Sequence, residues 1–109
     1  MIDWTRVSTL RDQVGTDDFD KVVEVFLKEV ERVICRLKRA NEVSDCKDLD
    51  FLKGSAFSLG FQEFCSLCEK GEDLCNKGMK ATIDLSEISI CFESSKKCFL
   101  AELADLIKD

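Results

Sequence analysis

Apolar residues between Phe19 and Leu37 recur at spacings of three and four, and this repeat constrains the fold more than any other feature of the sequence. Its members are Phe19, Val22, Val23, Phe26, Val30, Val33, Ile34 and Leu37. The valines do not indicate a strand, because a strand would place apolar residues at every second position. The repeat predicts a long amphipathic helix that starts after the break at Gly15 and reaches Ala40 or Asn41.

A short helix is expected before this one and a long helix after it. Asp3 can cap the short helix. The apolar side of the short helix carries Val7, Leu10 and Val14. A polar connection over residues 42–46 then leads into a central helix, which we expect to run from Asp48 to about Leu74, with Gly71 weakening its end. One side of this helix collects Leu49, Leu52, Ala56, Leu59, Leu67 and Leu74.

A stop signal and a cap separate the central helix from the last one. Asn76, Lys77 and Gly78 are typical of a helix C-terminus that ends in a left-handed glycine. Asp84, with Glu87 three residues later, resembles a capping box at the start of the last helix. The apolar side of that helix carries Ile88, Cys91 or Phe92, Ser95, Phe99, Leu103, Leu106 and Ile107.

One short and three long amphipathic helices with short connections predict an all-α fold. We expect an antiparallel four-helix bundle, with the short N-terminal helix capping one end. The 109 residues form a single domain over residues 1–109, which is long enough to bury one core. The absence of proline fits a chain with few turns.

The charge balance bears on partners and location. With 16 basic and 22 acidic residues, the net charge of −6 opposes nonspecific binding to nucleic acid or to anionic membranes. The sequence contains no run of 18 apolar residues, and residues 1–6 do not resemble a signal peptide. We therefore expect a cytoplasmic protein that binds neither nucleic acid nor membrane.

Seven cysteines are many for a chain of this length. An odd number cannot pair fully within one molecule, and cytoplasmic thiols stay reduced, so we interpret them mainly as small buried hydrophobic residues. Cys65 and Cys68 have the spacing of metal and redox motifs, with Cys75 on the same flank, while Cys91 and Cys98 share a face of the last helix. A thiol-based zinc or redox module therefore remains an alternative, although the motif lies within a regular helix and no histidine is present.

The stretch from Asp48 to Phe61 is the most informative about function. On one continuous helix, Asp50, Phe57 and Phe61 return to nearly the same angle, which places a carboxylate at the end of an apolar ridge. Gly54 and Gly60 each cost about 1 kcal/mol relative to alanine within a helix. Glycines at these positions indicate close approach, by a partner at Gly54 and by a neighbouring helix at Gly60.

This stretch resembles the helix of histidine-containing phosphotransfer (HPt) domains of bacterial phosphorelays, which reads His-x-Leu-Lys-Gly-Ser-Ala-x-x-Leu-Gly. The matching positions are Leu52, Lys53, Gly54, Ser55, Ala56, Leu59 and Gly60. The family's phosphorylated histidine falls on Asp50, and the chain contains no histidine. The resemblance covers most of the chain, and it implies a bundle of HPt type with an exposed site near the middle of a long helix.

In HPt domains the imidazole takes a phosphoryl group from one receiver domain and passes it to another. A carboxylate at Asp50 is a poorer acceptor, because it would form an acyl phosphate and repels the incoming group. Receivers perform that chemistry beside a Mg²⁺ ion, but Asp48 points away from Asp50 and Asp45 is no closer. Taken alone, Asp50 is a solvated acid near a helix N-terminus, so we expect neither catalysis nor a cofactor or metal.

The residues around Asp50 fit a docking face instead. In the family, the lysine at the position of Lys53 lies beside the acceptor and favours the phosphoryl charge; here an exposed ion pair with Asp50 is an equal alternative. Phe57 and Phe61 are more often core residues at such spacing, but HPt domains dock receivers through an apolar patch around the acceptor. The expected binding residues are therefore Asp50, Lys53, Gly54, Phe57 and Phe61.

The leading functional hypothesis is a noncatalytic HPt-like protein, a pseudo-phosphotransferase. It would bind, as a monomer, the receiver domain of a response regulator or of a hybrid histidine kinase. It would compete with true phosphotransfer proteins or hold a receiver without removing its phosphate. Two alternatives remain: the thiol-based module, and an ordinary phosphotransferase whose histidine has been replaced by Asp50 in this chain.

Overall fold

The computed structural model describes residues 2–43 and 45–107, and this part of the chain is helical almost throughout. The helices are α1 (Trp4–Val14), α2 (Thr16–Ala40), α3 (Cys46–Leu59), α4 (Gln62–Asn76) and α5 (Leu85–Ile107), with a short 3-10 helix η1 (Lys80–Thr82). Pairing of β type within the described residues is limited to one isolated bridge between Ile2 and Phe61. The prediction of an all-α fold is confirmed.

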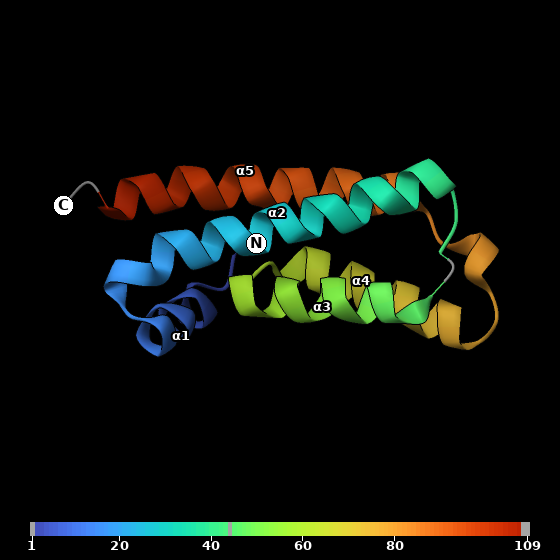
Figure 1. The fold of residues 1–109 in the computed structure, drawn as a ribbon, viewed down its shortest axis with the longest axis horizontal. Coiled ribbons are helices and arrows are strands. Elements are labelled where there is room, and N and C mark those ends of the chain that lie inside the picture. The colour runs from blue at the N-terminus through green and yellow to red at the C-terminus, as the bar shows by residue number, and fades with distance from the viewer. Residues whose placement is uncertain (1, 44, 108–109) are drawn as a thin grey trace.

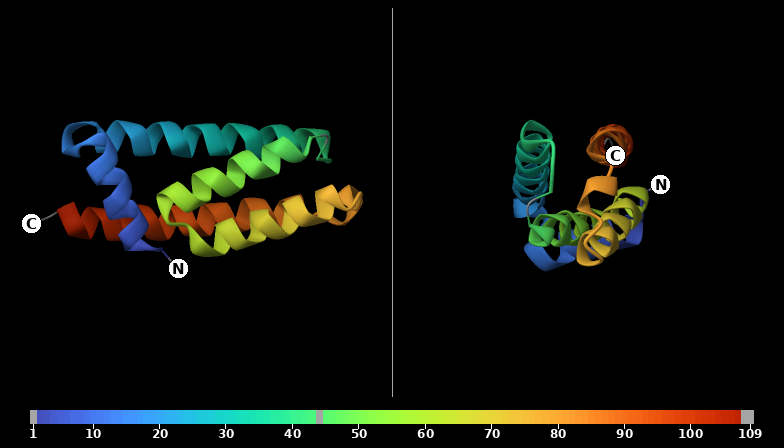
Figure 2. Two further views of the ribbon diagram at one scale, coloured as in Figure 1. Left: turned by 90° about the horizontal axis from the view of Figure 1, so that it is seen from below. Right: turned by 90° about the vertical axis from the view of Figure 1, so that its right-hand side faces the viewer.

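Four helices lie side by side along the long axis of the molecule and alternate in direction (Figure 1). Helix α2 packs against α3 and α5, and α4 packs against the same two helices, so the four surround a common core. Helix α1 lies across one end, as Figure 2 shows, and contacts α2 and α3. The ring of Trp4 in α1 stacks on Phe99 of α5, with 5.5 Å between the ring centroids.

The apolar repeat of α2 faces the core as predicted. Its buried members are Phe19, Val23, Val30, Val33, Ile34 and Leu37, joined by Leu27. The opposite side of the core is aromatic, because Phe61 and Phe64 meet Phe92 and Phe99 of α5. The centroid distances are 5.4 Å for Phe61 to Phe99 and 5.3 Å for Phe64 to Phe92. The predicted burial of the Leu106 and Ile107 side chains lies outside the part that the structure describes.

The expected continuous helix from Asp48 to Leu74 is wrong. The chain turns back after Leu59, so that α3 and α4 form a hairpin. Gly60 adopts a left-handed φ of 74°, and the Phe61 amide donates to the Ala56 carbonyl at 2.9 Å, the bonding pattern of a Schellman motif. A Cβ at Gly60 would lie 2.4 Å from the Asp3 carbonyl oxygen. Close approach at Gly60 therefore occurs, but it involves the N-terminal backbone and not a neighbouring helix.

Most helix ends follow the predicted capping signals. The Asp3 carboxylate accepts a hydrogen bond from the Thr5 amide at 3.1 Å, and that of Asp84 accepts one from Glu87 at 3.0 Å. Helix α4 ends at Asn76, before a left-handed glycine at position 78. Helix α3 begins at Cys46, two residues earlier than expected, because Asp45 caps it.

Candidate functional site

The outer side of α3 carries the exposed residues Asp50, Phe51, Gly54 and Phe57, which we call the α3 face. The Asp50 side chain is 70% exposed. A Cβ added at Gly54 would meet nothing within 4 Å, so the surface is open at its centre. Phe51 and Phe57, 40% and 49% exposed, lie on either side of this opening. The α3 face therefore presents a carboxylate and two aromatic rings around a flat, unobstructed helix turn.

Lys53 lies at the edge of the α3 face and reaches toward α4. Its Nζ donates to the Glu72 carboxylate at 2.6 Å and lies 3.7 Å from the nearer oxygen of Asp50. The hydrogen bond to Glu72 raises the pKa of Lys53, opposed by burial, and the charges of Glu72 and Asp50 add to the rise. The predicted ion pair with Asp50 is present, but Glu72 is the closer partner.

Glu72 was not identified from the sequence. It is separated from Lys53 by 19 residues, and the two meet only because the hairpin folds α4 back along α3. On a single continuous helix they would lie more than 25 Å apart along the axis at roughly 1.5 Å per residue. No local pattern in the sequence indicates this pair.

Helix α1 also contributes to the surface beside Phe57. The Arg6 guanidinium carbon lies 3.9 Å from the centroid of the Phe57 ring, a cation–π geometry. A groove of about 350 Å³ runs between α1 and the α3–α4 turn, with Arg6, Phe57 and Gln62 among its lining residues. The positive charge of Arg6 therefore borders the apolar part of the α3 face.

Phe61 does not belong to the α3 face, although the sequence predicted an apolar ridge that included it. It follows the turn at Gly60, outside the regular part of α3, and its side chain is completely buried. The ridge required one continuous helix from Asp50 to Phe61, and the chain reversal removes that geometry. Among the predicted binding residues, Asp50, Gly54 and Phe57 share the outer face, Lys53 borders it and Phe61 lies in the core.

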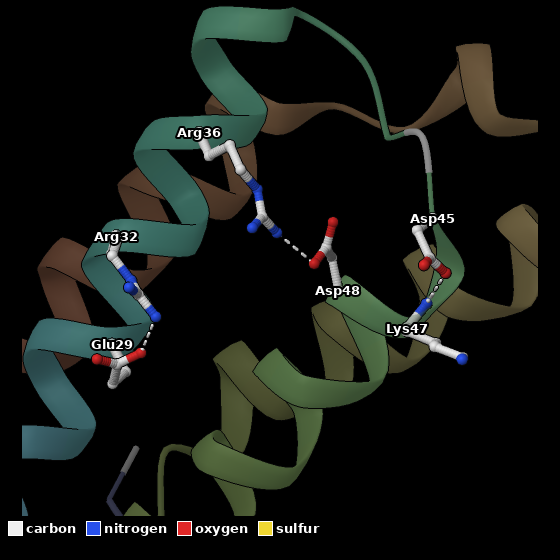
Figure 3. Close-up of polar contacts among 6 residues, drawn as sticks. All are labelled: Glu29, Arg32, Arg36, Asp45, Lys47 and Asp48. Carbon is white, nitrogen blue, oxygen red and sulfur yellow. Dashed lines mark hydrogen bonds and ion pairs between the residues drawn. The ribbon is translucent and has the colours of Figure 1, made fainter.

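The other acidic residues near the start of α3 point away from Asp50. The Asp48 carboxylate pairs with Arg36 of α2, as Figure 3 shows, and Asp45 accepts a hydrogen bond from the Lys47 amide at 2.9 Å. Within the described residues, no three side chains of histidine, cysteine, aspartate or glutamate are grouped so that they could hold a metal ion. Asp50 therefore has a cationic neighbour in Lys53, and among the described residues it belongs to no such group of three.

The cysteines do not all remain free thiols, which corrects the sequence-based expectation. Cys46 and Cys75 form a disulfide that joins the start of α3 to the end of α4, with 5.8 Å between their Cα atoms. Cys68 is fully buried, as predicted for a small hydrophobic residue, whereas Cys35 is exposed. Because Cys75 is bonded to Cys46, it is not a thiol on a shared flank with Cys65 and Cys68.

Cys68→Ser is expected to lower the free energy of unfolding by about 1–3 kcal/mol, because it places a hydroxyl in an apolar core. Burial raises the pKa of the Cys68 thiol far above its usual range, and neighbouring Cys65, Cys91 and Glu72 add to the rise. In the native protein, Cys68 should therefore react with a maleimide much more slowly than exposed Cys35. Modification of both thiols at equal rates would contradict this burial.

Comparisons with protein-family models, with curated proteins and with solved structures find no match to this chain. Among the helices as the structure describes them, none is both long and apolar enough to cross a membrane. A function for the chain is therefore inferred from its own residues and their arrangement.

Proposed function

We propose that this chain is an HPt-like protein that binds a receiver domain through the α3 face without accepting a phosphoryl group. The observation that carries the proposal is the placement of Asp50 and Gly54. They lie exposed, one turn apart, on the helix that carries the HPt-like motif. The alternating helices α2–α5, with α1 across one end, support an antiparallel bundle of HPt type.

The chemistry around Asp50 favours binding over transfer. Its carboxylate repels a phosphoryl group, whereas an imidazole would be a neutral nucleophile. Lys53, the nearest cation, is held by Glu72 at 2.6 Å and is only partly available to offset developing charge. A docked receiver would therefore keep its phosphate.

The aromatic residues supply the apolar part of the docking surface. Phe51 and Phe57 remain substantially exposed although every other phenylalanine except half-buried Phe26 is buried in the core. Exposed aromatic rings beside a flat helix turn are suited to a small interface, near the lower limit of about 1,200 Å² that is usual for transient signalling. Arg6 and Asp50 would lie at its polar rim.

Gly54→Arg is expected to abolish receiver binding while leaving the protein folded. The arginine would project from the centre of the α3 face, and the fold should tolerate it because no atom lies within 4 Å of the new Cβ. Arginine is also a better helix former than glycine by roughly 1 kcal/mol. Binding should be measured by biolayer interferometry against receiver domains from the protein's own cell, with circular dichroism to verify the fold.

Ser94→Arg is the matched control, because Ser94 is an exposed helical position on α5, which does not pack against α3. This variant should bind as the unmodified chain does. If a receiver binds and Gly54→Arg binds it equally well, the α3 face is not the docking surface. If none of the receivers binds the unmodified chain, the proposed function is wrong.

A further inference from the structure

The α3–α4 hairpin is closed by different means at its two ends. At the turn, the Schellman motif and the hydrogen bond from the Asp3 amide to the Gly60 carbonyl, 2.7 Å long, hold α3 to α4 and to the N-terminal segment. At the open end, the covalent bond between Cys46 and Cys75 joins the first residue of α3 to the penultimate residue of α4. The disulfide therefore joins the two helices at the end of the hairpin opposite the turn.

The noncovalent contacts at the open end are mainly apolar, because Leu49 and Cys75 lie in the buried core. Leu49 packs against Gly71 of α4, where an added Cβ would lie 3.5 Å from a Leu49 methyl carbon. The Arg36–Asp48 ion pair is largely exposed on the arginine side and stabilises little on its own. A groove of about 650 Å³ bounded by residues 41–43 and 80–86 opens at this same end. The disulfide thus adds a covalent bond to an end of the hairpin that is otherwise held by apolar packing and an ion pair.

We propose that the Cys46–Cys75 disulfide is a reversible redox clamp that orders the α3 face and thereby controls docking. Asp50 lies one helical turn after Cys46, so the disulfide is close to the α3 face. The effect on docking rests on the proposed function. With the disulfide formed, the first two turns of α3 are fixed against α4. With it reduced, these turns open more often, and the α3 face loses the ordered surface that a receiver would contact.

The chemistry is thiol–disulfide exchange with a dithiol reductant. One thiolate of the dithiol attacks the sulfur of Cys46, which is half-buried, whereas Cys75 is only 3% exposed. The Cys46–Cys75 bond breaks, and Cys75 leaves as a thiolate that takes up a proton. The second thiol of the reductant then displaces Cys46, so two electrons and two protons pass to the protein. Oxidised glutathione reverses the step and leaves as two molecules of reduced glutathione.

Hydrogen exchange tests the clamp on the protein alone. Dithiothreitol should speed amide exchange over residues 47–53 by about tenfold, with little change over residues 92–99 of α5, because opening is local to the hairpin end. The Cys46→Ser/Cys75→Ser variant should exchange as the reduced protein does and should not respond to dithiothreitol. Cys35→Ser, which changes an exposed thiol, should respond as the unmodified chain does.

Receiver binding tests the control of docking. The oxidised protein should bind about tenfold more tightly than the reduced one, and oxidised glutathione should restore the affinity. Equal exchange over residues 47–53 in both states, or equal acceleration throughout α5, would overturn a local clamp. Equal affinity in both states would overturn control of docking, with the proposed function intact. If no receiver binds in either redox state, the proposed function and the control of docking are both wrong. Amide exchange still decides whether the disulfide orders α3.

Discussion

Phe61→Ala is expected to lower the free energy of unfolding by about 3–5 kcal/mol, the range for removing a buried phenylalanine ring. The ring is completely buried and contacts Phe99 edge to face at 5.4 Å and Phe92 at 6.2 Å. Its backbone also pairs with Ile2, so the residue connects the N-terminal segment, the hairpin turn and α5. A void here would weaken three parts of the fold together. Equilibrium unfolding in urea measures the loss.

Phe57→Ala is the matched control, four residues earlier in the chain. Its ring is half-exposed, and its contact with Arg6 is worth about 0.5–1 kcal/mol at an exposed site. We therefore expect at most about 1 kcal/mol of destabilisation, together with weaker receiver binding. Equal destabilisation by the two substitutions would contradict the assignment of Phe61 to the core and Phe57 to the surface.

Because the chain reverses at Gly60, the apolar periodicity alone could not show that Phe57 is exposed and Phe61 is buried. Leu67 and Leu74 fall at the same helical angle as Leu49 and Leu52 when the helix is continued, so the apolar period passes through the turn unbroken. The available signal was the capping chemistry: a glycine directly after an apolar helix, followed by an apolar residue, is typical of a Schellman motif. The capping signals at Asp3, Asp84 and Gly78 likewise predicted helix ends correctly.

The features of the candidate site that depend on α3 alone could be predicted from the sequence, whereas its contacts with α4 could not. The exposure of Asp50, Gly54 and Phe57 follows from their positions within α3 alone. The contacts of Lys53 with Glu72 and of Cys46 with Cys75 span 19 and 29 residues, and both require the hairpin. The expectation of reduced thiols came from an assumed compartment and carried no information about which cysteines are neighbours.

Asp50→His is expected to convert the chain from one that accepts no phosphate into one that is labelled by a phosphorylated receiver. The imidazole would stand on an exposed position of α3, and the substitution removes a negative charge that opposes the phosphoryl group. Aspartate and histidine have similar helix propensities, so the fold should be retained. The label, followed from a radioactive receiver phosphate, should be labile in acid and stable in base. The unmodified chain should stay unlabelled.

Asp48→His provides the control for a histidine placed on the same helix but off the α3 face, since Asp48 faces Arg36 of α2. It should remain unlabelled. Lys53 lies 3.7 Å from the Asp50 carboxylate but donates its closer hydrogen bond, at 2.6 Å, to Glu72, so we expect Glu72 to compete with a phosphoryl group for the lysine charge. Adding Glu72→Gln to Asp50→His should therefore increase the labelling rate, by making the lysine charge available to the phosphoryl group.

Labelling of the unmodified chain at Asp50 would overturn the proposal that phosphotransfer is lost. An unlabelled Asp50→His variant that still binds the receiver would show that changes beyond Asp50 disable the site, and Glu72 is then the first residue to test.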